Sequence, residues 1–429
     1  MKLLVAILLN AALLGLLIPW LQRLRQEPHV GRWLLPTFGL KLISTLLSVL
    51  LLSGDSKLFL LWSQRMTAQL WQAPGSWLHM LGQDSFQFGQ WEMVYHGFSN
   101  TFFVMKVLSV LNLASGGSVW LDSLYFSLFS FWGSWQLVLA LRRLWSEQAG
   151  MGAIGAFLLW PTVVYWTSGL TKESLLVGSG ATVVATVLEL CYGQRRRVAP
   201  QLLLLLPMAV LHFKMRFFSA ALLLGVMSGL GLIRVIQHLG GAKRWLPQVL
   251  LLLGLLAGGA WAASEVSPAF RLNKFTSQLQ RNYSDLLRSS LNRPHLEYPT
   301  LAPTTESVLQ NAPGAVVNVL TYPRVWEGGG FLYIVAGLEN VVLFVLLVSA
   351  LLSAMQQRNG PLPFAVVLCV LVYCLLLAAL LGLTTPNLGT LSRYRVSFLP
   401  FLVLLLLQNH YVARLQQRLS PDKPWPTRH

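Results

Sequence analysis

The sequence carries little charge for its length. Only 11% of its 429 residues are charged, whereas an ordinary soluble domain carries about 25%, and 55% are hydrophobic with a mean hydropathy of +0.58. These values exclude a water-soluble globular protein, and the high hydrophobicity also excludes a disordered chain. Because a membrane-spanning helix needs about 20 apolar residues, the chain has room for about ten spans and their loops.

The sequence also lacks the motifs of most cofactor-dependent enzymes. Its three cysteines lie in apolar stretches, so they indicate no disulfide framework and no Cys-x-x-Cys metal site. It has no phosphate-binding P-loop, no glycine-rich dinucleotide loop, no His-Glu-x-x-His and no Asp-x-Asp pair. We therefore expect no cofactor, with a divalent ion on a lone carboxylate as the open alternative. Any reaction must draw its energy from the substrate or from a gradient.

Apolar runs separated by charged or turn residues predict an all-α, polytopic transmembrane helical bundle of about 11 spans, in a single integral membrane domain over residues 1–429. The runs lie near 3–22, 34–53, 118–141, 151–166, 173–192, 201–213, 217–235, 246–262, 331–354, 364–383 and 397–413. The first run is long and has no small-residue cleavage site, so we expect a retained span rather than a signal peptide. Pro161 and Pro207 interrupt two runs shorter than a full span, and broken membrane helices often border a polar cavity.

The Lys and Arg residues predict the orientation of these spans. The net charge is +17, from 32 Lys and Arg against 15 Asp and Glu, and cytoplasmic turns collect such residues. With the N-terminus outside, the basic groups near Arg23, Arg142, Arg195 and Arg234 fall in cytoplasmic turns, and so does the tail 414–429. Membrane topology thus accounts for the charge, and we expect no nucleic-acid partner.

This orientation places two long segments, 54–117 and 263–330, on the outer face. Within the first, apolar residues recur at helical spacing in SKLFLLWSQRMTAQLWQ, residues 56–72. The run TFFVMKVLSVLNLA, residues 101–114, is too short to span a membrane. Both patterns are typical of amphipathic helices that lie in the membrane interface.

Five basic residues fall in short outer turns, where positive charge is disfavoured. The turns TSGLTKES, HFKMRFF and TTPNLGTLSRYRVSF supply Lys172, Lys214, Arg216, Arg393 and Arg395. A fold that gathers these turns around one cavity would suit a phosphate or pyrophosphate group, since Arg offers a planar fork and Lys a point charge. We favour this anionic ligand. The alternative is that each side chain extends to lipid headgroups.

Several acidic residues are candidates for chemistry in the outer segments. Asp55 follows the second span directly, where a carboxylate can act as a general base towards an acceptor hydroxyl, although a helix cap explains it equally well. Asp84 and Glu92 are secondary candidates. Glu173 opens a helix, and the favourable interaction of a carboxylate with the helix dipole accounts for it.

Two ionisable residues lie inside expected spans. Glu339 lies about 12 Å into its helix, at 1.5 Å per residue, and an acid at that depth is normally paired or functional. Lys41 lies in the second span, near enough to the cytoplasm for its ammonium group to extend to the surface.

Four segments carry a family resemblance: LLSGDSKLF, PTVVYWTSGLTKES, LTYPRVWEGGGFLYIVAGLEN and NLGTLSRYRVSFLPF. They resemble segments of multi-span proteins of Bacteroidetes-type bacteria that are associated with cell-surface polysaccharide assembly. The order of features also resembles the GT-C superfamily of glycosyltransferases, which use lipid-linked sugars.

The resemblance implies specific roles for the residues above. Asp55 would be the catalytic base, and the five basic turn residues would bind the phosphate of an undecaprenyl-phosphate-linked sugar. Tyr394 and Trp166 would line the sugar or polyprenyl site. The protein would lie in the bacterial inner membrane, with the lipid-linked sugar and membrane lipids as its partners.

Two other functions stay open. An O-antigen-type polysaccharide polymerase or ligase would depend on Arg216, Arg324, Arg393 and Arg395 rather than on Asp55. A transporter of lipid-linked substrate or a scaffold for an export complex would need no catalysis. Its docking element would be the loop 263–330, with a basic face formed by Arg271, Lys274, Arg281, Arg288 and Arg293. We favour a solvated surface for these five residues.

Overall fold

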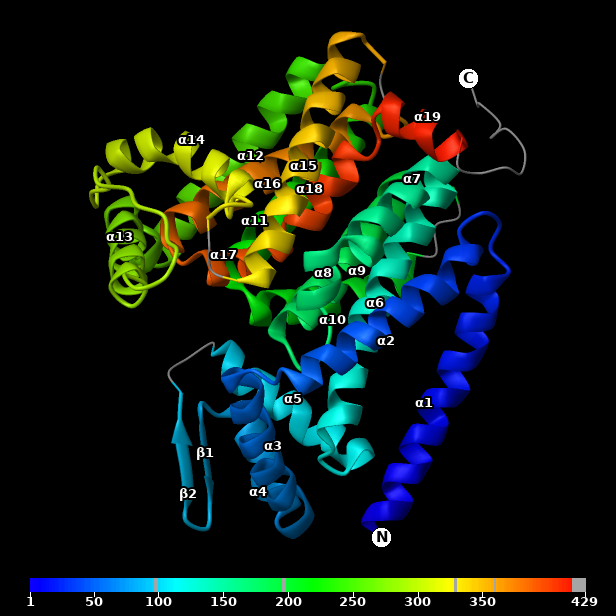
Figure 1. The fold of residues 1–429 in the computed structure, drawn as a ribbon, viewed down its shortest axis with the longest axis vertical. Helices are drawn as coiled ribbons and strands as arrows, with labels where there is room; N and C mark the ends of the chain where they lie inside the picture. The colour runs from blue at the N-terminus through cyan, green and yellow to red at the C-terminus, as the bar shows by residue number, and fades with distance from the viewer. Residues whose placement is uncertain (96–98, 195–197, 328–329, 359, 419–429) are drawn as a thin grey trace. The chain divides into compact units, whose positions relative to one another are not determined.

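The computed structural model describes residues 1–95, 99–194, 198–327, 330–358 and 360–418. In these residues the chain forms 19 α-helices and one two-stranded antiparallel sheet, and it is 80% helical (Figure 1). The predicted all-α polytopic membrane bundle is therefore confirmed.

Nine helices of the described residues are long and apolar enough to cross a membrane. They are α1 (Lys2–Arg25), the helix Gly31–Leu50 that contains α2 (Leu34–Leu50), α6 (Val119–Leu144), α9 (Lys172–Tyr192), α10 (Val198–Met215), α11 (Phe217–His238), α12 (Trp245–Val266), α15 (Phe331–Met355) and α16 (Phe364–Thr384). A tenth span is formed if the pair Leu388–Ser397 and Leu399–Leu406, bent by 64°, crosses as one.

The expected number of 11 spans is wrong because two apolar runs break into short helices. Residues 151–166 fold as α7 (Glu147–Ala153), a π-helix (Ile154–Leu159) and α8 (Pro161–Trp166). Proline has no backbone N–H to donate, so Pro161 begins a new helix instead of continuing the old one. The run 397–413 divides between α18 (Leu399–Leu406) and α19 (His410–Arg418), while α17 (Leu388–Tyr394) precedes it.

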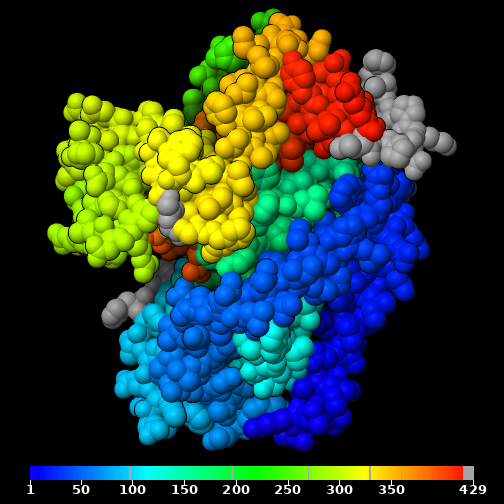
Figure 2. All heavy atoms as spheres, in the orientation of Figure 1, coloured from blue at the N-terminus to red at the C-terminus, as the bar shows by residue number. Residues whose placement is uncertain are grey.

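The chain divides into two compact units. Unit 1 comprises residues 1–136, 164–182 and 206–217, and unit 2 comprises residues 137–163, 183–205 and 218–429. Helices α6, α8, α9, α10 and α11 contribute residues to both. Within unit 1, the most apolar 18 residues of α1 include no buried residue, and the helix forms the dark blue surface in the space-filling view (Figure 2).

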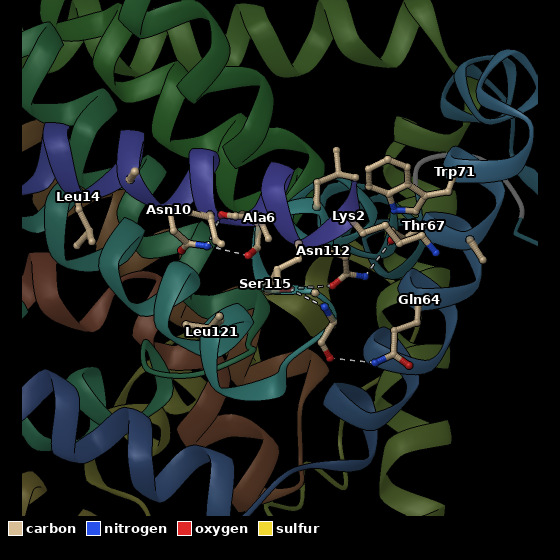
Figure 3. A pocket seen from close by; sticks show the side chains of 18 residues that line it. Lys2, Ala6, Asn10, Leu14, Gln64, Thr67, Trp71, Asn112, Ser115 and Leu121 are labelled. Carbon is tan, nitrogen blue, oxygen red and sulfur yellow. Dashed lines mark hydrogen bonds between the residues drawn. The ribbon is translucent and has the colours of Figure 1, made fainter.

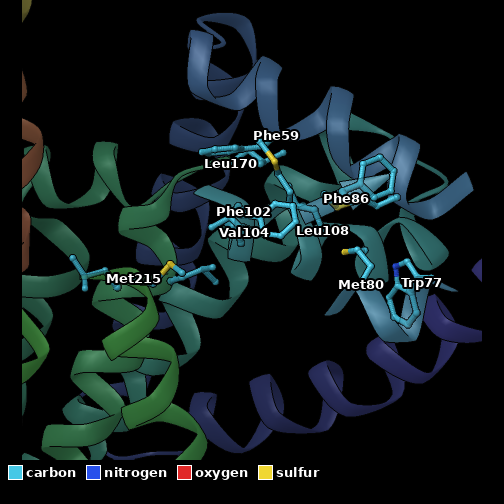
Figure 4. Close-up of a cluster of buried hydrophobic side chains, with 14 residues drawn as sticks. Phe59, Trp77, Met80, Phe86, Phe102, Val104, Leu108, Leu170 and Met215 are labelled. Atoms are coloured by element: carbon cyan, nitrogen blue, oxygen red, sulfur yellow. The ribbon is translucent and has the colours of Figure 1, made fainter. Parts of the chain in front are cut away.

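In unit 1 the segment after the second span forms a small packed layer. Its elements are α3 (Gly54–Gln72), α4 (Pro74–Gly82), β1 (Ser85–Phe88), β2 (Trp91–Val94) and α5 (Asn100–Ser115). Helices α3 and α5 form over the two runs predicted to be helical, and the hydroxyls of Ser53 and Ser99 cap them by accepting from backbone N–H groups. Side chains such as Phe59, Met80 and Phe102 form their common buried cluster (Figure 4).

In unit 2 the long loop 263–330 is largely helical. Its main elements are α13 (Leu272–Arg288), which buries Leu279 and Tyr283, and α14 (Thr305–Thr321). Helix α14 packs closely on α16. A Cβ added at Gly382 of α16 would lie only 2.8 Å from the Ala315 carbonyl oxygen of α14. The five basic residues expected on this loop are exposed, as a solvated surface requires: Arg271, Lys274, Arg281, Arg288 and Arg293.

Candidate anion-binding site

The first turn of α3 is bonded to the loop that leads into α9. Asp55 lies in this turn, directly before Ser56. The Ser56 hydroxyl donates a hydrogen bond to the Leu170 carbonyl oxygen at 2.9 Å. Leu170 precedes Lys172, the first residue of α9, by two positions. The structure therefore holds the Asp55 segment next to the segment that carries Lys172.

Lys172 is surrounded by residues from two further segments. Its ammonium group donates to Asn100 Oδ1 at 2.8 Å and to Thr101 Oγ1 at 2.7 Å, and it lies 5.4 Å from the centre of the Phe59 ring. Asn100 in turn donates from its amide nitrogen to the Met215 carbonyl oxygen at 3.0 Å. The start of α9, the start of α5 and the end of α10 thus meet within unit 1.

Arg216 follows the end of α10 and pairs with Glu173. The guanidinium lies 3.5 Å from a Glu173 carboxylate oxygen. The Arg216 side chain is 19% exposed, whereas Glu173 is almost fully buried. The helix dipole was the expected explanation of Glu173, and the structure adds Arg216 as a cationic partner. Arg216 therefore keeps an exposed edge while its charge stabilises a buried acid.

Lys214 and Asp84 both act electrostatically on Lys106 of α5. Burial lowers the pKa of Lys106, the Asp84 carboxylate raises it, and the Lys214 ammonium lowers it. Lys106 also donates hydrogen bonds to the carbonyl oxygens of Leu81 and Gln83. Lys214 and Asp84 therefore lie within electrostatic reach of the same layer of unit 1.

Tyr95 connects Asp55 to the start of α5. Burial raises the pKa of the Tyr95 hydroxyl, and the Asp55 carboxylate raises it further because a phenolate would be repelled there. The Tyr95 ring stacks on Phe102, with centroids 5.6 Å apart. Phe102 follows Thr101, the hydrogen-bond partner of Lys172.

Buried side chains hold the loop between α8 and α9 in place. Lys41 donates to the Thr167 carbonyl oxygen at 2.5 Å and to the Thr167 hydroxyl at 2.8 Å. Ser130 donates to the same carbonyl oxygen at 2.8 Å, and the Ser127 hydroxyl accepts from the Gly169 N–H at 2.7 Å. Irregular backbone at membrane depth needs such internal partners. Lys41 is only 5% exposed. Its ammonium binds this loop, whereas we expected it from the sequence to extend to the cytoplasmic surface.

In unit 2, Arg395 and Glu339 form a buried polar cluster. Their side chains lie 3.7 Å apart and are 1% and 7% exposed. Arg395 also donates to Asn340 Oδ1 at 2.7 Å, and Glu339 accepts from the Thr162 N–H and hydroxyl, both at 2.6 Å. Glu339 is paired inside the bundle, as its depth predicts. The Arg395 guanidinium is already directed at acceptors of its own unit.

The remaining sequence candidates are less buried than Arg395 and Glu339. Arg393 and Tyr394 are half-buried in the last turn of α17 in unit 2. Arg324 is exposed, with its guanidinium 4.5 Å from the centre of the Tyr322 ring. Glu92 is exposed on β2. Trp166, at the end of α8 in unit 1, packs edge-on against Tyr165.

The structure therefore assembles part of the expected site. Asp55 lies in unit 1 together with Lys172, Lys214 and Arg216, whereas Arg393 and Arg395 belong to unit 2. Sequence reasoning missed Asn100, Thr101 and Tyr95. The signal in Ser99-Asn100-Thr101 is that of a helix cap, which gives no indication of a lysine partner 71 residues away. In the described residues, no three His, Cys, Asp or Glu side chains form a group that could hold a metal ion.

Comparison of the chain with protein-family models, with curated proteins and with solved structures gives no match. The fold defines a multi-pass helical membrane protein.

Proposed function

We propose that this protein transfers a sugar from an undecaprenyl-phosphate-linked donor to an acceptor on the outer face of the bacterial inner membrane, in the assembly of a surface polysaccharide or glycoconjugate. One observation carries the proposal. The carboxylate of Asp55 shares a single packed unit with Lys172, Lys214 and Arg216, through the contacts of Ser56 with Leu170 and of Asn100 with Lys172 and Met215.

The connectivity of the spans supports a common membrane side for these groups. Helices α6 and α9 run parallel, because Gly133 approaches Gly178 and, further along both helices, Arg143 lies 3.5 Å from Glu189. The first residues of α6 and α9 therefore lie on one side. Helix α9 crosses the membrane away from that side, and α10 crosses back to it. The last residue of α10, Met215, therefore lies on the same side of the membrane as Lys172.

The proposed reaction balances in atoms and charge. The acceptor hydroxyl oxygen bonds to the anomeric carbon while the bond from that carbon to the phosphate oxygen breaks. Asp55 takes the hydroxyl proton as a general base. The phosphate gains one negative charge as it leaves, and Lys172, Lys214 and Arg216 would stabilise that charge most strongly in the transition state.

The test is sugar transfer in proteoliposomes, with a panel of undecaprenyl-phosphate sugars and membrane lipids from a bacterial strain that lacks the chain. Asp55→Asn should lower transfer at least about 100-fold, the lower end of what a general base contributes. Asp285→Asn, on the exposed face of α13, is the matched control. The substitution at Asp55 should leave donor binding intact because the amide keeps the shape of the carboxylate.

The other outcomes distinguish the alternatives. Full transfer by Asp55→Asn together with its loss in Arg393→Ala would contradict the base assignment and support the polymerase or ligase. An unchanged surface-polysaccharide phenotype after replacement of Lys172, Lys214 and Arg216 would support the non-enzymatic role.

A further inference from the structure

Unit 1 fully encloses one acid, Asp122. It lies in the first turn of α6 and is 0% exposed, whereas Asp55, Asp84 and Asp285 are exposed. In the described part of the chain, neither oxygen of its carboxyl group has a hydrogen-bond partner, and no Lys, Arg or His forms an ion pair with it. Acids inside membrane proteins are normally paired or functional, and Asp122 has no pairing that accounts for its position.

The surroundings of Asp122 favour a neutral carboxylic acid. A carboxylate that is buried without a partner is so unfavourable that the group neutralises instead. The start of α6 carries partial positive charge, which stabilises a carboxylate, but this contribution is small beside the cost of removing an ionised group from water. The Asp122 oxygens also accept from none of the N–H groups at that helix start. The site therefore requires a bound cation.

The Ser115 hydroxyl connects Asp122 to a cavity. It interacts with the Asp122 carboxyl group, although the two make no hydrogen bond of standard geometry. The Ser115 oxygen accepts from the Gly117 N–H at 3.0 Å, and its own proton is donated to Asn112 Oδ1 at a long 3.4 Å. Because a hydroxyl proton rotates to suit its acceptors, Ser115 can turn from Asn112 to Asp122.

The cavity beyond Ser115 has a volume of about 840 Å³ and lies between α1, α3 and the turn from α5 to α6 (Figure 3). A water molecule occupies about 30 Å³ in the liquid, so the cavity has room for many. Ser115 and Asn112 line it, and its wall includes the exposed residues Lys2 and Gln64. The cavity therefore reaches the protein surface, and water that enters it comes next to Ser115.

The neighbouring groups indicate that the bound cation is a proton. Tyr125 of α6 is within electrostatic reach of Asp122, but its hydroxyl donates to Asn10 Oδ1 at 2.7 Å and carries no charge. The one cation among the described residues that line the cavity, Lys2, lies over the Trp71 ring, 5.8 Å from its centre. Metal ions such as Mg²⁺ and Ca²⁺ need about six oxygen ligands, more than one carboxyl group and a serine hydroxyl supply.

We propose that Asp122 is a proton-binding site whose proton exchanges with water in the cavity through the Ser115 hydroxyl. In each exchange the Asp122 proton passes to the Ser115 oxygen while the Ser115 proton passes to a cavity water, and the carboxylate regains a proton by the reverse transfers. Buried acids serve proton relays of this kind in membrane transporters. The site shares no residue with the cation site formed by Lys172, Lys214 and Arg216, so it stands independently of the proposed sugar transfer.

Infrared spectroscopy of the full-length protein in phosphatidylcholine nanodiscs at neutral pH tests the site. The difference between the wild type and Asp122→Asn should contain the C=O stretching band of a protonated carboxyl group. Asp285→Asn, which replaces an exposed aspartate, should remove bands of an ionised carboxylate instead. Carbon-13 labelling of aspartate carboxyl groups identifies the protonated band in the wild type, whether or not Asp122→Asn folds.

Exchange into D₂O tests the route. The Asp122 band should shift as a deuteron replaces the proton, and in Ser115→Ala it should shift at least about tenfold more slowly than in the wild type, as for any step whose barrier rises by about 1.4 kcal/mol. Ser115→Thr keeps the hydroxyl and should restore the rate. Ser134→Ala is the matched control, because the Ser134 hydroxyl donates to the Ser130 carbonyl oxygen within α6.

Three results would overturn the proposal. Absence of a protonated-carboxyl band would mean that Asp122 is ionised. Loss of the band when sodium replaces potassium in the buffer would mean that a metal cation occupies the site. Equal exchange rates in the wild type and Ser115→Ala would remove Ser115 from the route.

Discussion

The Ser56 hydroxyl donates a 2.9 Å hydrogen bond to the Leu170 carbonyl oxygen, which connects two segments separated by 114 residues. Asp55 directly precedes Ser56, and Lys172 follows Leu170 by two positions. The proposed base and the proposed phosphate ligand therefore lie on two segments of unit 1 that are hydrogen-bonded to each other.

Lys41 is expected to act as a positioning residue for Lys172. In Lys41→Met, the Thr167 carbonyl oxygen loses a charged donor at 2.5 Å while keeping Ser130. Binding of undecaprenyl phosphate should weaken by up to about tenfold, because the loop loses a buried hydrogen bond that contributes about 1.5–3 kcal/mol to its stability and binding must then supply part of the energy that orders it. Thr37→Val is the matched control, because buried Thr37 bonds within its own helix. Unchanged binding in a folded Lys41→Met protein would contradict this role.

The close approach of α6 and α9 should make Gly133 intolerant of a side chain. A Cβ on Gly133 would overlap the Gly178 carbonyl oxygen, and backbone cannot move aside as a flexible side chain can. Gly133→Ala should therefore destabilise the protein by about 1–3 kcal/mol, the usual range for overpacking, measured as the midpoint of thermal unfolding in detergent. Gly15→Ala has open space around the new methyl group. Equal midpoints for both variants would be inconsistent with the packing described.

Arg395 and Glu339 should stabilise unit 2 as a pair. Arg395→Met leaves a buried carboxylate without its cation, and the removal of one partner of such a pair costs about 3–5 kcal/mol. The double variant Arg395→Met/Glu339→Gln should recover part of this loss. Arg143→Met disrupts an exposed pair and should cost about 1 kcal/mol or less. If Arg395→Met unfolds at the wild-type temperature, Arg395 has no structural role and is available for a ligand.

The orientation of the chain is tested by cysteine labelling in intact cells of the Cys191→Ser background. Ser277→Cys lies on the exposed face of α13, in the loop proposed to be outside, and His238→Cys lies at the exposed end of α11, which is proposed to be cytoplasmic. A membrane-impermeant maleimide should label the first directly and the second only after permeabilisation. The reverse pattern would move unit 1 and its cation site to the cytoplasmic face.

Local patterns in the sequence predicted nine of the long apolar helices in the described part of the chain and the helical state of α3 and α5. Long apolar runs determine membrane helices, and Ser53 and Ser99 mark the starts of α3 and α5. The count of spans failed at Pro161 and at residues 407–409, between α18 and α19, because hydropathy registers an apolar run but not the break inside it. The β1–β2 hairpin, with a turn at Gly89 and Gln90, was not predicted, although hydrophobic and polar residues alternate in SFQF and WEM on either side of that turn.

The candidate site was predictable only in part. An unusual lysine or arginine in a short turn is visible in the sequence, but its partner is not. Lys41 bonds Thr167 across 126 positions and Lys172 bonds Asn100 across 72. Such contacts depend on how helices pack, and neither apolar periodicity nor charge distribution contains that information.

The most direct test of the central claim is the binding of undecaprenyl phosphate to purified protein, measured by native mass spectrometry against phosphatidylglycerol. Lys172→Ala is compared with Lys274→Ala, an exposed lysine on α13. The account predicts preferential binding that falls at least about tenfold in Lys172→Ala, or about 1.4 kcal/mol, and is unchanged in Lys274→Ala. Binding no stronger than that of phosphatidylglycerol, or equal binding by the two variants, would contradict an anionic-lipid site at Lys172.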